Sequence, residues 1–225
     1  MTRGKGAAQK CHCEEPAGDE AISPPFVIAS EAKQSDGITT LMRSNIALIG
    51  FMGAGKSAVG RALAAKLDME FVDLDSLIEK KAGRSIAEIF ARDGEAAFRS
   101  MEAETTAQVA GKEKKVIACG GGIVLEQNNI DIIKKSSIIV YLAAEPAVLL
   151  RRVLNGKERR PLLEVADPAA AIDGLLKYRR PLYEKAADII IDTSQLDIAG
   201  AAGKINEELV KNESFNLAKH STRQG

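Results

Sequence analysis

Residues 50–57 read Gly-Phe-Met-Gly-Ala-Gly-Lys-Ser and fit the phosphate-binding pattern G-x-x-x-x-G-K-[ST]. They follow the apolar run Asn45–Ile49. A strand ending at Ile49, a glycine-rich turn and a helix opening near Lys56 would aim backbone N–H groups and the positive end of the helix dipole at one point. This pattern favours a nucleotide polyphosphate as the ligand. A glycine-rich turn that binds nothing is the alternative, and the agreement of the fixed positions with their flanks disfavours it.

The rest of the chain alternates β-rich runs with longer helical patterns, which is typical of parallel βαβ units. We therefore predict an α/β protein with the P-loop NTPase fold: an open five-stranded parallel sheet with helices on both faces. The predicted strands are 45–49, 70–73, 116–119, 138–142 and 188–191. The predicted helices are 56–67, 77–81, 85–92, 95–110, 147–154, 168–184 and 198–211. In such sheets ligands bind beyond the carboxyl ends of the strands.

Two carboxylates, Asp73 and Asp75, follow the second predicted strand. Asp75 could simply cap the helix that follows. We expect the second strand to lie adjacent to the first, so that its carboxyl end is next to the γ-phosphate. One aspartate could then bind Mg²⁺ through water while the other accepts a hydrogen bond or a proton from an acceptor hydroxyl.

Three consecutive glycines, Gly120, Gly121 and Gly122, follow the third predicted strand. They could be slack in a loop, but at a strand end the missing side chains would let a ligand lie against the backbone, which we favour. Cys119, just before them, is expected to be a small core residue without chemistry.

Arginines stand at three further places in the chain. Arg99 and Glu102 are spaced i, i+3 on a predicted helix, so Arg99 taken alone reads as a surface ion-pair partner. The basic segment 155–162, bracketed by Gly156 and a proline, reads as a mobile lid or as a solvated basic loop. Arg179 lies near the end of a helix, whose carboxyl terminus is one possible partner.

The composition suits one globular domain with additional length: 225 residues, 45% hydrophobic, with 31 basic and 31 acidic side chains. The balanced charge gives no support for a nucleic-acid or membrane partner, and three cysteines are no disulfide framework, so we expect a soluble cytoplasmic protein. We divide the chain into an extension at 1–43 without periodicity, a domain at 44–212 and a polar tail at 213–225. Met42 is a plausible true start.

Taken together, these motifs resemble the shikimate kinase family, of the nucleoside monophosphate kinase-like P-loop group. The resemblance covers residues 44 to about 211. Besides the phosphate loop and Asp73-Leu74-Asp75, it rests on Ser85-Ile86-Ala87-Glu88-Ile89-Phe90, Gly94-Glu95, Phe98-Arg99 with Glu102, Gly120-Gly121-Gly122, Arg160-Pro161-Leu162-Leu163 and Arg179-Arg180-Pro181-Leu182-Tyr183.

The resemblance implies transfer of the ATP γ-phosphate to the 3-hydroxyl of shikimate, by a monomer that uses Mg²⁺. It implies catalytic roles for Lys56, Asp75 and the lid arginine Arg160, for which Arg159 is the alternative. The implied ATP-binding residues are Gly53, Ala54, Gly55, Lys56, Ser57, Ala58 and Arg160. The implied shikimate-binding residues are Asp75, Arg99, Gly120, Gly121, Gly122 and Arg179. Ser57 and Asp73 would hold Mg²⁺, and adenine would lie near Arg151 or Arg152 and the loop 192–194.

Two rival functions stay open at this point. A gluconate-type small-molecule kinase of the same fold would share the phosphate loop, although Arg99 with Arg179 favours a rigid acceptor that carries a carboxylate. A nucleotide-binding module without catalysis is disfavoured because Lys56, Ser57 and both aspartates are present.

Overall fold

A computed structural model describes residues 43–155, 167–212 and 215 of this chain. Its five strands are β1 (Asn45–Ile49), β2 (Glu70–Asp73), β3 (Lys115–Ala118), β4 (Ser137–Ala143) and β5 (Ile189–Asp192). They form one parallel sheet in the order β2-β3-β1-β4-β5. The predicted α/β fold with an open five-stranded sheet is confirmed.

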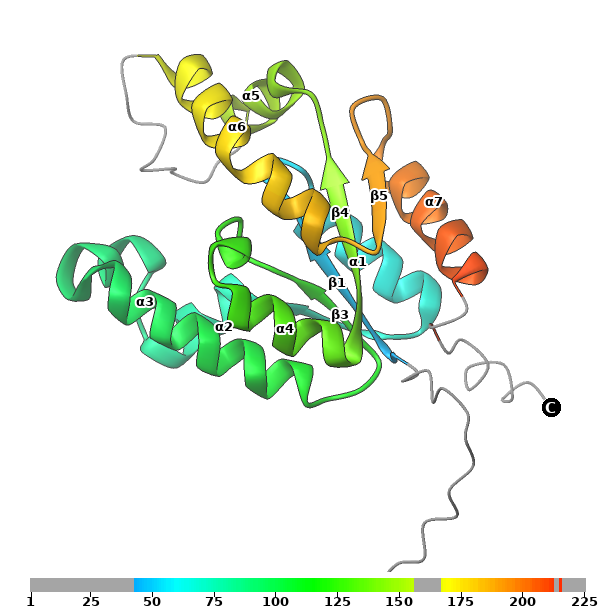
Figure 1. Ribbon diagram of the computed structural model, residues 1–225, viewed down its shortest axis with the longest axis horizontal. Coiled ribbons are helices and arrows are strands. Elements are labelled where there is room, and N and C mark those ends of the chain that lie inside the picture. Colours follow the sequence, from blue (N-terminus) through cyan, green and yellow to red (C-terminus); the bar gives the residue numbers. More distant parts are fainter. Residues whose placement is uncertain (1–42, 156–166, 213–214, 216–225) are drawn as a thin grey trace, which may run out of the picture. The chain divides into compact units, whose positions relative to one another are not determined.

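The helices cover both faces of this sheet (Figure 1). Helices α1 and α7 pack together on one face, while α4 and α6 lie against the other, with α3 beside α4 and α5 beside α6. Their bounds are α1 Lys56–Leu67, α2 Leu74–Ala82, α3 Ile86–Ala110, α4 Gln127–Ser136, α5 Pro146–Leu154, α6 Pro168–Ala186 and α7 Ile198–Lys211, with the short 3₁₀ turn η1 at Ile123–Leu125.

The core lies between the sheet and its helices. All five residues of β1 are buried, because a central strand of a parallel sheet is covered on both faces. A smaller apolar cluster of Ile78, Ile89 and Phe98 holds α2 against α3. This second cluster anchors the part of α3 that carries Arg99.

Most predicted elements occur within two or three residues of their predicted bounds, and α1 and α7 match them. Helix α3 spans both helices predicted at 85–92 and 95–110, but Gly94 interrupts it with φ 80° and ψ 174°. The sequence analysis missed α4 and η1. Helix α4 is short and rich in polar and β-branched residues, so its intrinsic helix propensity is low.

One predicted neighbourhood is wrong: β2 does not lie next to β1, because β3 pairs with both and separates them. The aspartates after β2 are therefore one strand further from the phosphate loop than expected. The predicted lid at 156–162, with Arg160, lies outside the described residues, as does almost all of the predicted extension and tail.

Candidate active site

The phosphate loop, residues 50–57, turns directly from β1 into α1. Gly50, Gly53 and Gly55 have φ angles of 145°, 79° and 91°, which side chains other than glycine rarely adopt. Each of the first two is also crowded, since a methyl group on Gly50 would lie 2.6 Å from the Leu142 carbonyl oxygen and one on Gly53 would lie 2.8 Å from Val153. The loop therefore has the predicted conformation, and it packs against β4 and α5.

Two polar side chains begin α1 at the end of this loop. The Lys56 ammonium donates hydrogen bonds to the carbonyl oxygens of Gly50 and Phe51, at 2.8 and 3.0 Å. It is thus held over the loop in which a polyphosphate would bind. The Ser57 hydroxyl donates to Asp73 Oδ2 at 2.6 Å, so β2 reaches the phosphate loop despite the intervening β3.

The two aspartates after β2 play different structural parts. Asp73, rather than Asp75, caps α2: its Oδ1 accepts from the Ser76 backbone N–H at 3.2 Å. Asp75 lies in the first turn of α2 and faces the glycine triplet, which is the name used below for Gly120–Gly122. Capping and ligand binding were alternatives for Asp75, and the geometry assigns the cap to its neighbour.

The glycine triplet is crowded by polar side chains. A methyl group on Gly120 would lie 2.7 Å from Asp75 Oδ1 and 3.2 Å from Glu102 Oε1. A methyl group on Gly122 would lie 2.7 Å from Arg99 Nη2. A carboxylate from α2 and a guanidinium from α3 thus converge on three residues without side chains. The triplet is therefore enclosed by polar side chains, and its role as a backbone platform for a ligand stays a prediction.

Arg99 is held beside the triplet by two carboxylates of its own helix. Its Nη1 donates to Glu102 at 2.7 Å and its Nη2 to Glu95 at 3.1 Å. Glu102 is only 1% exposed, and burial raises its pKa more than Arg99 lowers it. Burial disfavours the charge on Arg99, but its bonds to Glu102 and Glu95 outweigh that effect and raise its pKa. Arg99 is thus part of a buried pair and not only a surface ion-pair partner.

Helix α6 approaches the triplet from the other side. Arg179 Nη1 reaches the Gly121 carbonyl oxygen at 3.5 Å, and the Tyr183 hydroxyl donates to the same oxygen at 2.5 Å. The helix carboxyl terminus is therefore not the partner of Arg179. Arg99 of α3, Arg179 of α6 and Asp75 of α2 thus gather around the glycine triplet.

The two glycine-rich turns lie next to each other. A methyl group on Gly121 would lie 3.6 Å from the Met52 backbone nitrogen and 3.7 Å from the Gly50 carbonyl oxygen. The phosphate loop therefore lies beside the triplet, where we predict the second ligand. This is the geometry that a transfer between two bound molecules requires.

Two hydrogen bonds from Arg152 join the parts of the predicted adenine region. Arg152 donates to the Thr193 hydroxyl at 3.1 Å and to its carbonyl oxygen at 2.7 Å. Arg151 is exposed on the same helix. The structure thus brings α5 and the loop after β5 together, at the side of the phosphate loop where Gly53 packs on Val153.

Sequence reasoning assigned no role to Tyr183, and it used Glu102 only as a spacing partner of Arg99. Both are buried and both contact the groups that surround the triplet. A signal for Glu102 was present, since i, i+3 spacing from an arginine predicts an ion pair. No local pattern could connect Tyr183 with Gly121, because 62 residues separate them.

Cys119, just before the triplet, is 2% exposed, and burial raises the pKa of its thiol. It is a core residue without activation, as predicted.

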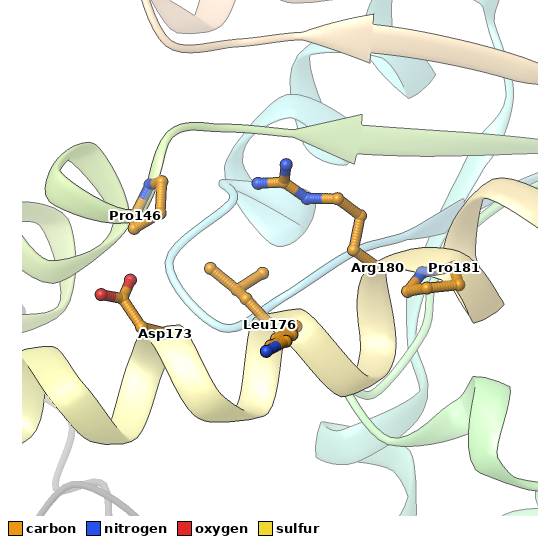
Figure 2. A pocket seen from close by; sticks show the side chains of 6 residues that line it. Pro146, Asp173, Leu176, Arg180 and Pro181 are labelled. Carbon is orange, nitrogen blue, oxygen red and sulfur yellow. The ribbon is translucent and has the colours of Figure 1, made fainter.

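A separate hollow of about 360 Å³ lies between α5 and α6 (Figure 2). Its lining residues are Pro146, Asp173, Leu176, Lys177, Arg180 and Pro181, none of which belongs to the predicted site. Among the described residues, no helix is both long and apolar enough to cross a membrane.

Comparison with known proteins gives one consistent result. The family model of shikimate kinase matches residues 52–210. A shikimate kinase from Pelotomaculum thermopropionicum is 47% identical over 161 residues, which cover 72% of this chain and 92% of the relative. Another from Symbiobacterium thermophilum is 43% identical over 166 residues, covering 73% and 95%. The solved structure of shikimate kinase from Acinetobacter baumannii in complex with shikimate is 38% identical and superposes with a TM-score of 0.73, covering 77% of this chain and 96% of that one.

Proposed function

This chain belongs to the shikimate kinase family, and we propose that it transfers the γ-phosphate of ATP to the 3-hydroxyl of shikimate. It is an ATP-dependent kinase. One observation carries the choice of acceptor: Asp75, Arg99 and Arg179 converge on the glycine triplet, which lies beside the phosphate loop. Shikimate carries one carboxylate and several ring hydroxyls, and this site presents two guanidinium groups and one carboxylate.

The acceptor would bind with its carboxylate at Arg99 and Arg179. Guanidinium groups form charge-assisted, often bidentate bonds to a carboxylate, so they fix the orientation of a rigid ring. Glu102 and Glu95 already hold the Arg99 guanidinium in place, which reduces the ordering that binding would require. The ring would then lie along the backbone of Gly120, Gly121 and Gly122.

At the opposite end of the ring, Asp75 would accept a hydrogen bond from the 3-hydroxyl and take its proton as the oxygen attacks the γ-phosphorus. The bond between the γ-phosphorus and the β,γ-bridging oxygen breaks, and ADP leaves with the electron pair. Lys56 and the lid arginine Arg160 would stabilise the charge on the transferring phosphoryl group. The remaining ATP contacts would come from the backbone of residues 53–58.

Magnesium fits the oxygen atoms at the end of the phosphate loop. The Ser57 hydroxyl and the Asp73 carboxylate lie 2.6 Å apart and are hard oxygen donors of the kind that Mg²⁺ prefers. The described residues contain no group of three or more His, Cys, Asp or Glu side chains suited to a metal, so Mg²⁺ would take its other ligands from phosphate and water. Bound there, Mg²⁺ would neutralise charge on the β- and γ-phosphates.

A coupled assay of ADP release tests this function directly. Purified protein with MgATP is offered shikimate, gluconate or a nucleoside monophosphate, each over the same concentration range. We expect only shikimate to stimulate ADP release, with shikimate 3-phosphate identified by mass spectrometry. Stimulation by gluconate and not by shikimate would instead select the rival kinase, and no stimulation by any acceptor would select the inactive module.

We also propose that the enzyme acts as a monomer in the cytoplasm. The described residues assigned to the acceptor gather around the glycine triplet of the same domain, which supports a site built within one chain. Size-exclusion chromatography with light scattering should give a mass near 24.0 kDa at catalytic concentrations. Activity that appears only in a larger species would contradict the monomer.

A further inference from the structure

The carbonyl groups of the glycine triplet are each held by a hydrogen bond. The Gly120 carbonyl accepts from the Ile123 backbone N–H at 3.2 Å, and the Gly122 carbonyl accepts from that of Leu125 at 3.0 Å. Both donors belong to η1, the turn that follows directly. The Gly121 carbonyl is bound instead by Tyr183, on α6. Glycines have no side chains to pack and lose the most backbone freedom on folding. These hydrogen bonds therefore fix the backbone conformation of the triplet.

Tyr183 is itself locked in place. Its side chain is 0% exposed, and its ring stacks on Tyr141 of β4 with the centroids 5.0 Å apart and the planes inclined by 20°. Burial raises the pKa of the Tyr183 hydroxyl, so this group stays protonated and remains a donor. Tyr141 pairs in register with Ile49, the last residue before the phosphate loop. The tyrosine pair thus connects α6 to the strand beside that loop.

Gly121 is the residue at which three parts of the site meet. The phosphate loop lies next to it, since a methyl group on Gly121 would come within 3.7 Å of both Met52 and Gly50. Helix α6 reaches its carbonyl oxygen on the other, through Tyr183 and, one turn earlier, through Arg179. A shift of Gly121 would therefore change both the distance to Arg179 and the distance to the phosphate loop.

We propose that Tyr183 is a positioning residue of the acceptor site, which holds Gly121, and with it the glycine triplet, in register with Arg179 and the phosphate loop. Tyr183 touches no substrate, because its hydroxyl is engaged by the Gly121 carbonyl inside the core. The inference rests on the proposed function, since it takes the triplet as the platform for shikimate.

The test compares two single-hydroxyl deletions in the same tyrosine pair. Tyr183→Phe removes the bond to Gly121 and keeps the stacked ring. Tyr141→Phe removes the other hydroxyl and leaves the Gly121 contact intact. We expect Tyr183→Phe to raise the KM for shikimate by about 3- to 10-fold, the effect of one lost hydrogen bond, while the KM for ATP stays within about twofold. Tyr141→Phe should leave both KM values within about twofold of wild type.

The readout separates positioning from a merely structural role. KM does not depend on the folded fraction of a preparation, so a lower yield of Tyr183→Phe does not disturb the comparison. If turnover is too low to measure, calorimetric titration of both folded proteins with shikimate gives the ratio of their dissociation constants, which should rise by about the same factor. An unchanged KM for shikimate in Tyr183→Phe, an equal rise in the KM for ATP, or the same rise in Tyr141→Phe would each overturn the inference.

The wild-type enzyme distinguishes this failure from failure of the proposed function. A wild-type protein that shikimate does not stimulate removes the proposed function and the role of Tyr183 together. A wild-type protein that shikimate stimulates, with a Tyr183→Phe variant identical to it, removes only the role of Tyr183.

Discussion

The phosphate loop and the glycine triplet use the same residue for different physical reasons. In the phosphate loop, Gly50, Gly53 and Gly55 have positive φ angles, so the backbone conformation itself requires glycine. No residue of the triplet has a positive φ angle. At Gly120 and Gly122 glycine is needed for space, because Asp75, Glu102 and Arg99 occupy the volume that a side chain would fill.

This difference separates the two substrates. The phosphate loop is a shape that the chain adopts locally, and it would serve any nucleotide polyphosphate. The chemical character of the triplet's surroundings comes only from the side chains gathered around it, which belong to α2, α3 and α6. We therefore expect backbone conformation to select the nucleotide, and tertiary contacts to select the acceptor. The predictions below test that division.

Asp75→Asn should produce the largest effect and leave the phosphate loop intact. Loss of the proposed base removes a contribution that general bases typically make, so kcat should fall by about 10²- to 10⁴-fold, with little change in ATP affinity. Stopped assays for kcat and calorimetry for ATP test this, with Asp131→Asn on the exposed face of α4 as control. Turnover near the wild-type value would remove the assigned role.

Arg99→Ala should act on the acceptor side alone. The KM for shikimate should rise by about 10- to 100-fold, because roughly 1.5–3 kcal/mol of charge-assisted hydrogen bonding is lost. Arg84→Ala is the matched control, since Arg84 lies just before α3 and forms only a half-exposed pair with Asp93. If the KM for ATP moved and that for shikimate did not, Arg99 would belong to the other site.

Gly53→Ala and Gly122→Ala test the division directly. Alanine at residue 53 must adopt a φ of 79° against Val153 and the Leu149 backbone, so we expect about 1–2 kcal/mol of strain and a Tm lower by roughly 2–8 °C. Alanine at residue 122 meets only the guanidinium end of Arg99, which must shift against Glu102 and Glu95. We therefore expect a smaller loss of Tm than at residue 53, while the KM for shikimate rises by about 3- to 10-fold.

Calorimetric scans and steady-state kinetics on both glycine variants provide the measurements. The expected results are opposite: stability lost at residue 53, acceptor affinity lost at residue 122. Equal losses of Tm would mean that conformation and not space requires glycine at both places.

Glu102→Gln should have the smallest effect, which is a change in how the free energy of unfolding depends on pH. Burial raises the pKa of this carboxyl above its unfolded value, so its favourable contribution is complete below the unfolded pKa and is lost as pH rises through the folded pKa. Glu102→Gln cannot titrate. The free energy of unfolding of the wild type minus that of the variant should therefore fall as pH rises above about 4, and then level off.

Urea unfolding of both proteins at several pH values gives that difference. A difference that rises with pH would mean that Arg99 dominates and lowers the pKa of Glu102. The same measurement thus decides whether burial or the ion pair with Arg99 has the larger effect on the pKa of Glu102.

The fold could be predicted well from the sequence where its signals are local. The run 45–49 followed by the phosphate-loop pattern placed β1 and α1 at their observed bounds. The resemblance supplied the acceptor residues, several of which the structure brings together. Helix α4 could not be predicted with the same reasoning, because tertiary packing and not intrinsic propensity stabilises it.

The local patterns of this chain were sufficient for the phosphate loop, the alternation of strands and helices, and the cluster of charged and glycine residues at strand ends. They were insufficient for the strand order that puts β3 between β1 and β2, for the capping of α2 by Asp73, and for the hydrogen bond from Tyr183 to Gly121. The physical reason is separation along the chain. Glycine conformation and helical periodicity act over a few residues, whereas strand neighbours and the α6 contact join residues that only the folded core brings together.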